Sequence, residues 1–551
     1  MQTINPAFLQ VYGNALLSIS EQMGIILVKT AYSTNIKERR DASVAVFDTQ
    51  GKLLALAQHI PLHFSSLFSS VEEIMDKWAI DEIHEGDVFI ANDPYSGGGS
   101  HLADIVFVNP VFYQGKLIAF VANLGHHADK SHRGTTIYDE GLRIPAVKLY
   151  DKGELMRDIY DLILLNYQLT KERQGDFRAQ LSTNRFGELK LQELCDKIGL
   201  DQFLYLANNW QEYGARAVKH AISQLPKGDY EFEDFLDDDG YGNEAIPIKL
   251  KVTVKDEDLI FDFTGSASQV DGPFNCVKSA LLATVFYCVK AFLDPTLPSN
   301  SGMFDSITVR APLGSIVNAV APAATNDRET TCQRIADTVL GAFAKIDPER
   351  VVAAGNGAVS FFTFSGVNAE TKEPYVYIET IGGGSGARST KDGLDAVQVH
   401  MTNTSNLPVE ALEMDYPLLV ERYEMVQDSG GAGKYRGGLA IRRTIRILEK
   451  SQNTVLIAAI ERAKFKPWGL FGGKAGSNAK LSVLRKGKIV NNSSKISLYP
   501  LEPEDIVDLV TPGAGGYGDP ACRDPVLIEK DLREEKISKK AARQDYNFFK
   551  T

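Results

Sequence analysis

The chain has 551 residues, too many for one hydrophobic core, and its 44% hydrophobic and 24% charged content is ordinary for a globular protein. The net charge of -12 and the lack of a basic run argue against a nucleic-acid-binding surface. The longest apolar run, near residues 281–293, is shorter than the roughly 20 residues of a membrane span. The first residues show no secretory signal, so we expect a cytoplasmic protein with no membrane partner.

Hydrophobic spacing predicts alternating helices and hairpins in the first part of the chain. Asn5-Pro6 is typical of a helix start, and the apolar residues after it recur at helical steps up to residue 31. The further elements expected here are strands 43–47 and 53–56, a helix at 67–78, a strand at 88–91, and a hairpin of 105–112 with 116–123.

The later parts of the chain differ from the first in composition and in hydrophobic pattern. Residues 167–225 look helical and polar, and strand-like runs with two apolar helices (278–293 and 332–343) follow from residue 230. After about residue 350 the chain is glycine-rich and β-like, and a charged helical tail begins at Asp524 as a surface or partner-contact element. We therefore expect a multidomain α+β protein with an N-terminal metal-binding α/β part and a glycine-rich, β-rich C-terminal half. The expected divisions are 1–165, 166–228, 229–350, 351–523 and 524–551.

The five cysteines are expected to be buried free thiols in a reducing compartment. They are far apart in sequence and form no CxxC pair. Their positions are 195, 276, 288, 332 and 522.

Seven of the nine histidines fall between His59 and His132, among aspartates and glycines. His101 and Asp104 are three residues apart in a turn, and a second group, Asn123 to Asp129, ends the next strand. Adjacent residues of a strand point to opposite faces, so only one of His126 and His127 is expected to face an ion. Asp41 begins a strand of the same sheet. The predicted ligands of one divalent metal, which is zinc, manganese or iron, are Asp41, His101, Asp104 and His126.

Other interpretations of these residues stay open at this stage. Aspartate and asparagine in such loops commonly do no more than satisfy the backbone of glycine turns. His59 and His63 are candidates for substrate contact or for support of the ligands, or are ordinary core histidines. His132, His220 and His400 receive no role.

The glycine-rich runs do not indicate a nucleotide site. Residues 513–518 match GxGxxG, but Asp519-Pro520 follows, which blocks a helix, and no βαβ pattern surrounds them. Residues 382–388 and 428–433 are not followed by GK[ST], and no GxSxG motif occurs. We interpret these runs as tight turns or walls around a ligand, with anion binding by backbone N–H groups as the alternative.

Several motifs together resemble the hydantoinase B/oxoprolinase family, in order from about residue 35 to 520. They are Asn35 to Asp41, His59-Ile60-Pro61, Asn92-Asp93-Pro94-Tyr95 through His101-Leu102-Ala103-Asp104, His126-His127-Ala128-Asp129, Asp262-Phe263-Thr264-Gly265, Asp294-Pro295, Asp428 to Gly438 and Thr511 to Pro520.

The resemblance implies one subunit of a two-part, ATP-dependent enzyme. In this family an A-type partner binds ATP and phosphorylates the carbonyl oxygen of the substrate, and the B-type subunit holds a metal and completes the reaction. Its ligands carry over onto Asp41, His101, Asp104 and His126, and the choice of His126 over His127 rests mainly on the resemblance. A hetero-oligomer is therefore expected.

The expected function is that of the B-type subunit of a cyclic amide hydrolase, of the hydantoinase, 5-oxoprolinase or caprolactamase type. Water would open the lactam or hydantoin ring, with Asp129, His59 or His63 accepting its proton. The chain length favours this branch. One alternative is a subunit of an ATP-dependent ketone carboxylase of the acetone or acetophenone type, and another is a non-catalytic structural subunit that binds metal.

Overall fold

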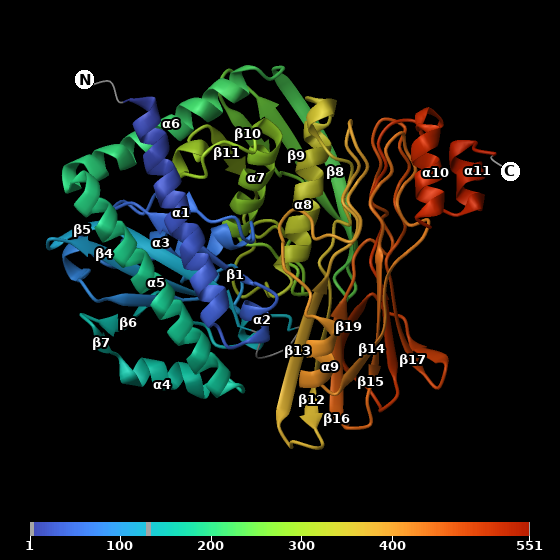
Figure 1. Ribbon diagram of the computed structural model, residues 1–551, viewed down its shortest axis with the longest axis horizontal. Coiled ribbons are helices and arrows are strands. Elements are labelled where there is room, and N and C mark those ends of the chain that lie inside the picture. The colour runs from blue at the N-terminus through green and yellow to red at the C-terminus, as the bar shows by residue number, and fades with distance from the viewer. Residues whose placement is uncertain (1–4, 128–133, 550–551) are drawn as a thin grey trace.

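The computed structural model describes residues 5–127 and 134–549. Its mixture of helices and separate sheets confirms the predicted α+β class. In Figure 1 the N-terminal sheet with its helices lies on one side and the strand-rich C-terminal half on the other. Helices α7 (Lys278–Leu293) and α8 (Arg328–Phe343) stand between them.

One seven-stranded antiparallel sheet forms the N-terminal part, in the order β2-β1-β5-β4-β3-β6-β7. In strand β1, Val44 and Val46 face one side and Ala45 and Phe47 the other, because side chains alternate along a strand. All four are fully buried, so both faces of the sheet are covered. The strands are β1 (Ala42–Phe47), β2 (Leu53–Leu56), β3 (Val88–Ala91), β4 (Asp104–Tyr113), β5 (Lys116–His126), β6 (Val147–Asp151) and β7 (Glu154–Leu155).

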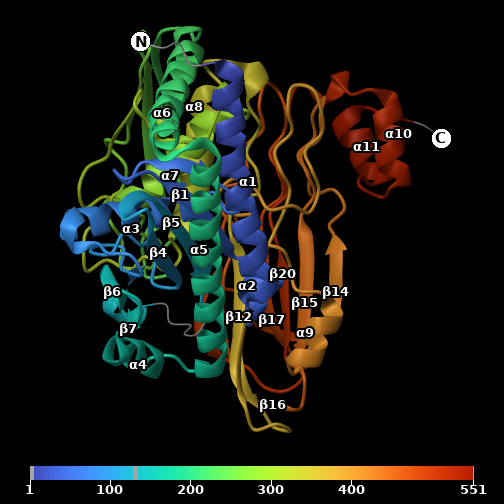
Figure 2. The same cartoon turned by 60° about the vertical axis from the view of Figure 1, so that its left-hand side comes forward.

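Helices cover the two faces of this sheet unequally. On the Val44 side lie α1 (Pro6–Thr30), α5 (Thr170–Ile198) and α6 (Leu200–Ser223), and Figure 2 shows α1 beside α5. Helix α3 (His63–Lys77) packs on the other side. The short helices α2 (Thr34–Lys37) and α4 (Arg157–Leu165) contact α1 and α5, respectively.

Helix α1 is, among the described helices, the one whose length and apolar composition would also suit a membrane span. Leu16, Met23 and Leu27 of this helix are fully buried in the core that it shares with the sheet and α5. Its apolar face is therefore used in packing inside the protein.

The central part pairs a four-stranded sheet, in the order β11-β10-β9-β8, with α7 and α8. Its strands are β8 (Gly228–Asp238), β9 (Glu244–Val254), β10 (Leu259–Asp262) and β11 (Ile307–Arg310). The largest hydrophobic cluster runs from α3 and the N-terminal sheet through Phe261, Ala280 and Ile335. Because this core is continuous, the proposed domain divisions stay predictions.

The C-terminal half contains two sheets that share one core, in the orders β13-β12-β16-β19 and β14-β15-β20-β17-β18. The strands are β12 (Ser360–Asn368), β13 (Pro374–Ile381), β14 (Leu418–Met425), β15 (Ile441–Ile447), β16 (Ser451–Ala459), β17 (Lys480–Arg485), β18 (Lys488–Asn491), β19 (Lys495–Pro500) and β20 (Ile506–Val510). Helix α9 (Val409–Asp415) packs against β14. The tail is helical, as predicted, with α10 (Pro525–Arg533) and α11 (Lys539–Tyr546) at the outer edge (Figure 1).

The glycine-rich runs pack backbone against backbone and do not form the tight turns that were one of the two expected interpretations, while the other, walls around a ligand, stays a prediction. A Cβ atom on Gly384 would lie 2.0 Å from the carbonyl oxygen of Gly438, and one on Gly513 would lie 1.9 Å from that of Ser429. The N–H groups of Ala514 and Gly515 donate to backbone carbonyls at 3.0 and 2.8 Å. Side chains are excluded at these positions because the neighbouring chain is too near.

Two expectations about local structure were wrong. Helix α3 begins at His63, four residues before the predicted start, because His63, Ser65 and Ser66 are buried and break the apolar pattern. Cys522 is exposed, whereas the other four cysteines are buried as expected.

Candidate metal centre

Three neighbouring strands of the N-terminal sheet bring acidic and histidine side chains together at one end of the strands. Asp41 precedes β1, Asp104 begins β4, and His126 ends β5, which lies between them. Asp104 pairs with His126 in the β4–β5 register, and the His126 N–H donates to the Asp41 carbonyl at 3.0 Å. The site is thus assembled by strand pairing.

His101, in the loop before β4, completes a compact group. Its Nε2 lies 2.9 Å from Asp104 Oδ1, and His126 Nδ1 lies 3.2 Å from the same oxygen. The two imidazole rings are stacked, with centroids 5.1 Å apart. One ligand atom from each of His101, Asp104 and His126 lies within 4.8 Å of the others. Two imidazoles and a carboxylate at such spacing are a donor set for a first-row divalent metal.

The outer contacts of this group orient its lone pairs inward. His101 Nδ1 lies 3.2 Å from the Asn326 carbonyl oxygen, and donation to that oxygen leaves Nε2 unprotonated. Asp104 Oδ2 accepts from Arg328 Nη2 at 2.8 Å, which leaves Oδ1 facing His101 and His126. His101 Nε2 is buried and has no hydrogen-bond partner despite the nearby carboxylate. A cation between these atoms would satisfy them, so the residues fit a metal.

Asp41 lies beside this compact group and is connected to it by His63. The Asp41 Oδ1 atom is 3.4 Å from His63 Nε2, which lies 3.8 Å from Asp104 Oδ1. Ser43 Oγ holds the other ring nitrogen of His63 at 3.1 Å. The structure therefore brings all four predicted ligands to one site, with Asp41 outside the tight group of three and His63 between the two carboxylates.

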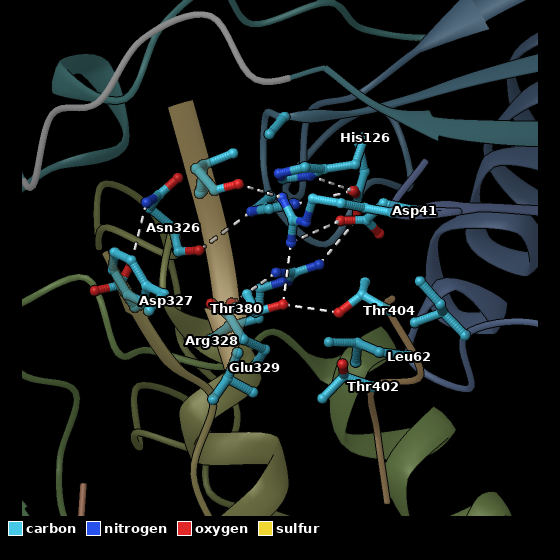
Figure 3. A pocket seen from close by; sticks show the side chains of 18 of the residues that line it. Asp41, Leu62, His126, Asn326, Asp327, Arg328, Glu329, Thr380, Thr402 and Thr404 are labelled. Atoms are coloured by element: carbon cyan, nitrogen blue, oxygen red, sulfur yellow. Dashed lines mark hydrogen bonds and ion pairs between the residues drawn. The ribbon is translucent and has the colours of Figure 1, made fainter. Parts of the chain in front are cut away.

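A cavity of about 110 Å³ opens at this group and extends to the C-terminal half. Figure 3 shows Asp41 and His126 on one side, and Arg328 and Glu329 from the start of α8 on another. Arg39 Nη2 donates to Thr380 Oγ1 at 3.0 Å, which ties the site to β13. Further wall residues from the C-terminal half are Val359, Phe361, Thr363, Val376, Ile378, Met401, Thr402, Thr404 and Ile457.

Burial and charge set the protonation of the groups in this cavity. Burial would raise the pKa of Asp104, but His101, His63 and Arg328 outweigh it and hold that pKa well below its usual range. Burial, helped by the charge of Arg328, lowers the pKa of His101 to about 4. Burial raises the pKa of Glu329 to about 7, against the opposing effect of Arg328. The cavity thus holds an ionised carboxylate, a neutral imidazole and a carboxyl group that titrates near neutrality.

The remaining predicted residues lie outside the compact ligand group. His59 lines a different cavity, and its ring tip packs on α1, where a Cβ atom at Gly24 would meet Nε2 at 2.1 Å. His127 lies at the wall of the metal cavity, but its ring nitrogens face away from the ligand group: Nε2 is 3.0 Å from Gln180 Oε1 and the other nitrogen contacts Arg173. Asp129 lies outside the described residues.

The polar residues at the start of α8 were not predicted from the sequence as part of the site. Asn326, Arg328 and Glu329 line the cavity although they are more than 200 residues away from His101. The signal that could have found them is the polar run Asn326 to Thr331, which leads into a helix that alternates polar and apolar residues, and in which Arg328 and Thr331 are fully or almost fully buried. A charged side chain is rarely buried without an oppositely charged or hydrogen-bonding partner, and such buried charges are concentrated at functional sites.

A second histidine–carboxylate group, formed by His84, Asp87 and Asp151, is less suited to a metal. Lys148 Nζ lies 2.9 Å from Asp87 and 3.0 Å from Asp151. This ammonium already neutralises both carboxylates.

The chain is similar both to proteins of about its own length and to longer ones, such as the 5-oxoprolinase of Dictyostelium discoideum, of which it covers 40%. It is 38% identical over 539 residues to an uncharacterised protein of Methanocaldococcus jannaschii, with 96% of this chain and 93% of that protein covered. It is 30% identical to the caprolactamase subunit beta of Pseudomonas jessenii, over 99% of this chain and 96% of that one.

Solved structures and a family model agree with this placement. The crystal structure of the ATP-dependent caprolactamase from Pseudomonas jessenii matches all of this chain and 97% of that one, with a TM-score of 0.92 at 28% identity. The nucleotide-free acetone carboxylase matches with a TM-score of 0.90 over 98% of this chain and 79% of that one. At 17% identity, this second match shows a shared fold. The family model described as Hydantoinase B/oxoprolinase matches residues 5–520. The chain therefore belongs to the hydantoinase B/oxoprolinase family.

Proposed function

We propose that this chain is the metal-dependent B-type subunit of a two-component, ATP-dependent cyclic amide hydrolase. The observation that carries the proposal is the convergence of the lone pairs of His101 Nε2 and Asp104 Oδ1, with His126 beside them, in a cavity lined by an acid and an arginine. Family membership and the likeness to caprolactamase support the choice of a lactam or hydantoin substrate. His101, Asp104 and His126 would hold one zinc, manganese or iron ion, with Asp41 as a fourth ligand.

Bound there, a divalent ion supplies Lewis acidity, which polarises oxygen ligands and lowers the pKa of water. The chain's own residues hold the site in shape. Arg328 donates to Asp104 and to Glu329 at 2.8 and 2.9 Å, so one guanidinium links the ligand group to the acid. His63, held by Ser43, lies near both Asp41 and Asp104. These contacts fix the carboxylates before substrate enters.

We assign the proton transfer to Glu329. Its carboxyl group lines the cavity, and its pKa of about 7 lets it accept a proton from the attacking water and deliver one to the ring nitrogen near neutral pH. Among the residues proposed from the sequence, His59 is turned toward α1, and His63 lies between two carboxylates. Glu329 combines access to the cavity with a suitable pKa.

ATP is assigned to an A-type partner, which would transfer its terminal phosphoryl group to the carbonyl oxygen, releasing ADP and making the resonance-stabilised amide carbon open to attack by water. Cleavage of the C–N bond would then leave an acyl phosphate, which a second water hydrolyses to the carboxylate and inorganic phosphate. The glycine-rich runs support this division, because several of their N–H groups already donate to backbone carbonyls. Their chains are also too close together to admit a phosphate between them.

The test is reconstitution of the full chain with an A-type subunit, followed by assays of ATP-dependent opening of hydantoin, 5-oxoproline and caprolactam. We expect turnover on at least one ring, a loss of about 10²–10⁴-fold in kcat for Glu329→Gln, and a flattened pH profile. Glu534→Gln, on an exposed tail helix end, is the matched control and should be unchanged. Ring opening that persists after complete metal removal would contradict the proposal.

Two alternatives give different results in the same assay. The first alternative is a ketone carboxylase, since the chain shares its fold with acetone carboxylase. Such an enzyme would couple ATP turnover to bicarbonate and would leave cyclic amides intact. In a non-catalytic subunit, Glu329→Gln would leave turnover by the complex unchanged, and His101→Ala would lower the unfolding temperature without affecting catalysis.

A further inference from the structure

A second and larger cavity lies next to the candidate metal centre. Its volume is about 330 Å³, within the range of about 300–1,000 Å³ that is usual for small-molecule sites. Its walls come from the segment between residues 53 and 64, from α7, and from the 3₁₀ turn Ser301–Phe304 with the residues just before it.

The segment from Ile60 to Phe64 is a thin wall between the two cavities. Leu62 and His63 line the metal cavity, Pro61 and Phe64 line the second cavity, and Ile60 lines both. The two cavities are therefore adjacent but have different linings.

Most of the second cavity is apolar and aromatic. The Phe286 and Phe304 rings are stacked with centroids 3.9 Å apart, and Phe64 lies 5.3 Å from Phe304. Leu53, Ala57, Ala283 and Met303 are buried wall residues. Such walls accept an aliphatic chain or a flat ring.

One ammonium group breaks this apolar lining. Lys290 Nζ donates to Ser299 Oγ at 2.5 Å and forms no ion pair within 4.0 Å among the described residues. Burial lowers the pKa of Lys290, and the charge of Asp294 opposes this only in part. The imidazole tip of His59, also in the wall, packs on α1. Lys290 and Ser299 thus form a small polar end in an apolar cavity.

We propose that this cavity is a binding site for a small monocarboxylate with an apolar body, such as hexanoate or benzoate. The carboxylate would pair with the Lys290 ammonium and accept from Ser299, while the chain or ring would lie against Phe64, Phe286 and Phe304. One ammonium and one hydroxyl match a single negative charge, and a second charge on the ligand would be left without a partner among apolar walls. The site is independent of the proposed ring-opening reaction.

The test is titration of the full chain with hexanoate by calorimetry, with hexan-1-ol and hexylamine as ligands of equal apolar body. We expect saturable 1:1 binding of hexanoate, and binding at least about tenfold weaker for the alcohol and the amine, since each lacks the charge-assisted contact. Lys290→Met should weaken hexanoate binding by about tenfold or more while leaving binding of hexan-1-ol unchanged. Lys488→Met, on an exposed strand, is the matched control.

A second variant keeps the test decisive if Lys290→Met does not fold. Ala291→Phe places a ring at the mouth of the cavity from an exposed position of α7, and it should abolish binding of both hexanoate and the alcohol. Absence of saturable hexanoate binding to the wild-type chain would overturn the proposal. So would equal binding of hexanoate by the wild type and Ala291→Phe. Neither result depends on metal content or on ring opening, so this proposal and the proposed function fail separately.

Discussion

Replacement of Arg328 tests the electrostatic core of the candidate metal centre. The Arg328 side chain is 3% exposed and pairs with Asp104, whose side chain is fully buried, at 2.8 Å. Loss of one partner of a buried ion pair typically costs about 3–5 kcal/mol, because the remaining charge stays buried without compensation. Arg328→Met retains most of the apolar stem and removes the charge. We therefore expect the free energy of unfolding to fall by about 3–5 kcal/mol.

Arg446→Met is the matched control for this variant. Arg446 also binds two carboxylates, Glu421 and Glu504, but its side chain is 30% exposed and Glu504 is 53% exposed. Exposed pairs contribute about 0–1 kcal/mol, so this variant should unfold nearly as the wild type does. The measurement is urea unfolding at pH 7, followed by circular dichroism. An Arg328→Met chain that unfolds at the same urea concentration as Arg446→Met would refute the reasoning.

Three further predictions concern single side chains. His126→Ala should abolish metal binding and His127→Ala should retain it, because His127 faces Gln180 instead of the site; equal metal content in the two variants would contradict this. Burial raises the pKa of Glu140 from 4.5 to about 8, so the stability that its protonated form contributes is fully present below pH 4.5 and is lost progressively as pH rises to about 8. Glu140→Gln should remove a slope of up to about 1.4 kcal/mol per pH unit from urea unfolding between pH 5 and 8, and an unchanged slope would refute the assignment. A thiol reagent should label Cys522 rapidly in the folded chain and the other four cysteines only on unfolding, whereas two or more fast thiols would show that the burial is wrong.

The helices and strands were predictable where the buried apolar residues recur at the regular spacing of a helix or a strand. The apolar residues of α1 recur at helical steps, Asn5 caps its first turn, and the structure places the helix at Pro6–Thr30. The hairpin turn at Gln114-Gly115 likewise placed β4 and β5 next to each other. Since their ends carry Asp104 and His126, local sequence was enough to predict that these two groups meet.

The rest of the site depends on contacts that no local pattern encodes. Arg328 and Glu329 reach the cavity because α8 packs between the two halves of the chain, more than 200 residues from His101. The start of α3 was missed because its first turn is buried yet polar, with His63 facing Asp41. Polar residues that serve a site interrupt the hydrophobic period from which helices are predicted.

The glycine-rich runs show another limit of prediction from sequence. Their sequence context argues against a dinucleotide site, and their composition indicated tight turns or the walls of a ligand site, whereas the structure has closely packed chains there. Glycine is compatible with both, because it permits unusual backbone angles as well as the near approach of another backbone. Composition alone does not distinguish these two uses.

Metal content of the purified full chain tests the central claim most directly. Elemental analysis of the wild type and of His220→Ala, which changes an exposed histidine, should give about one zinc, manganese or iron ion per chain. His101→Ala and Asp104→Ala, folded as judged by circular dichroism, should each give less than about a tenth of that amount. A folded wild-type chain that takes up no divalent ion even when saturated with all three metals, or a His101→Ala chain that retains a full complement, would contradict the account.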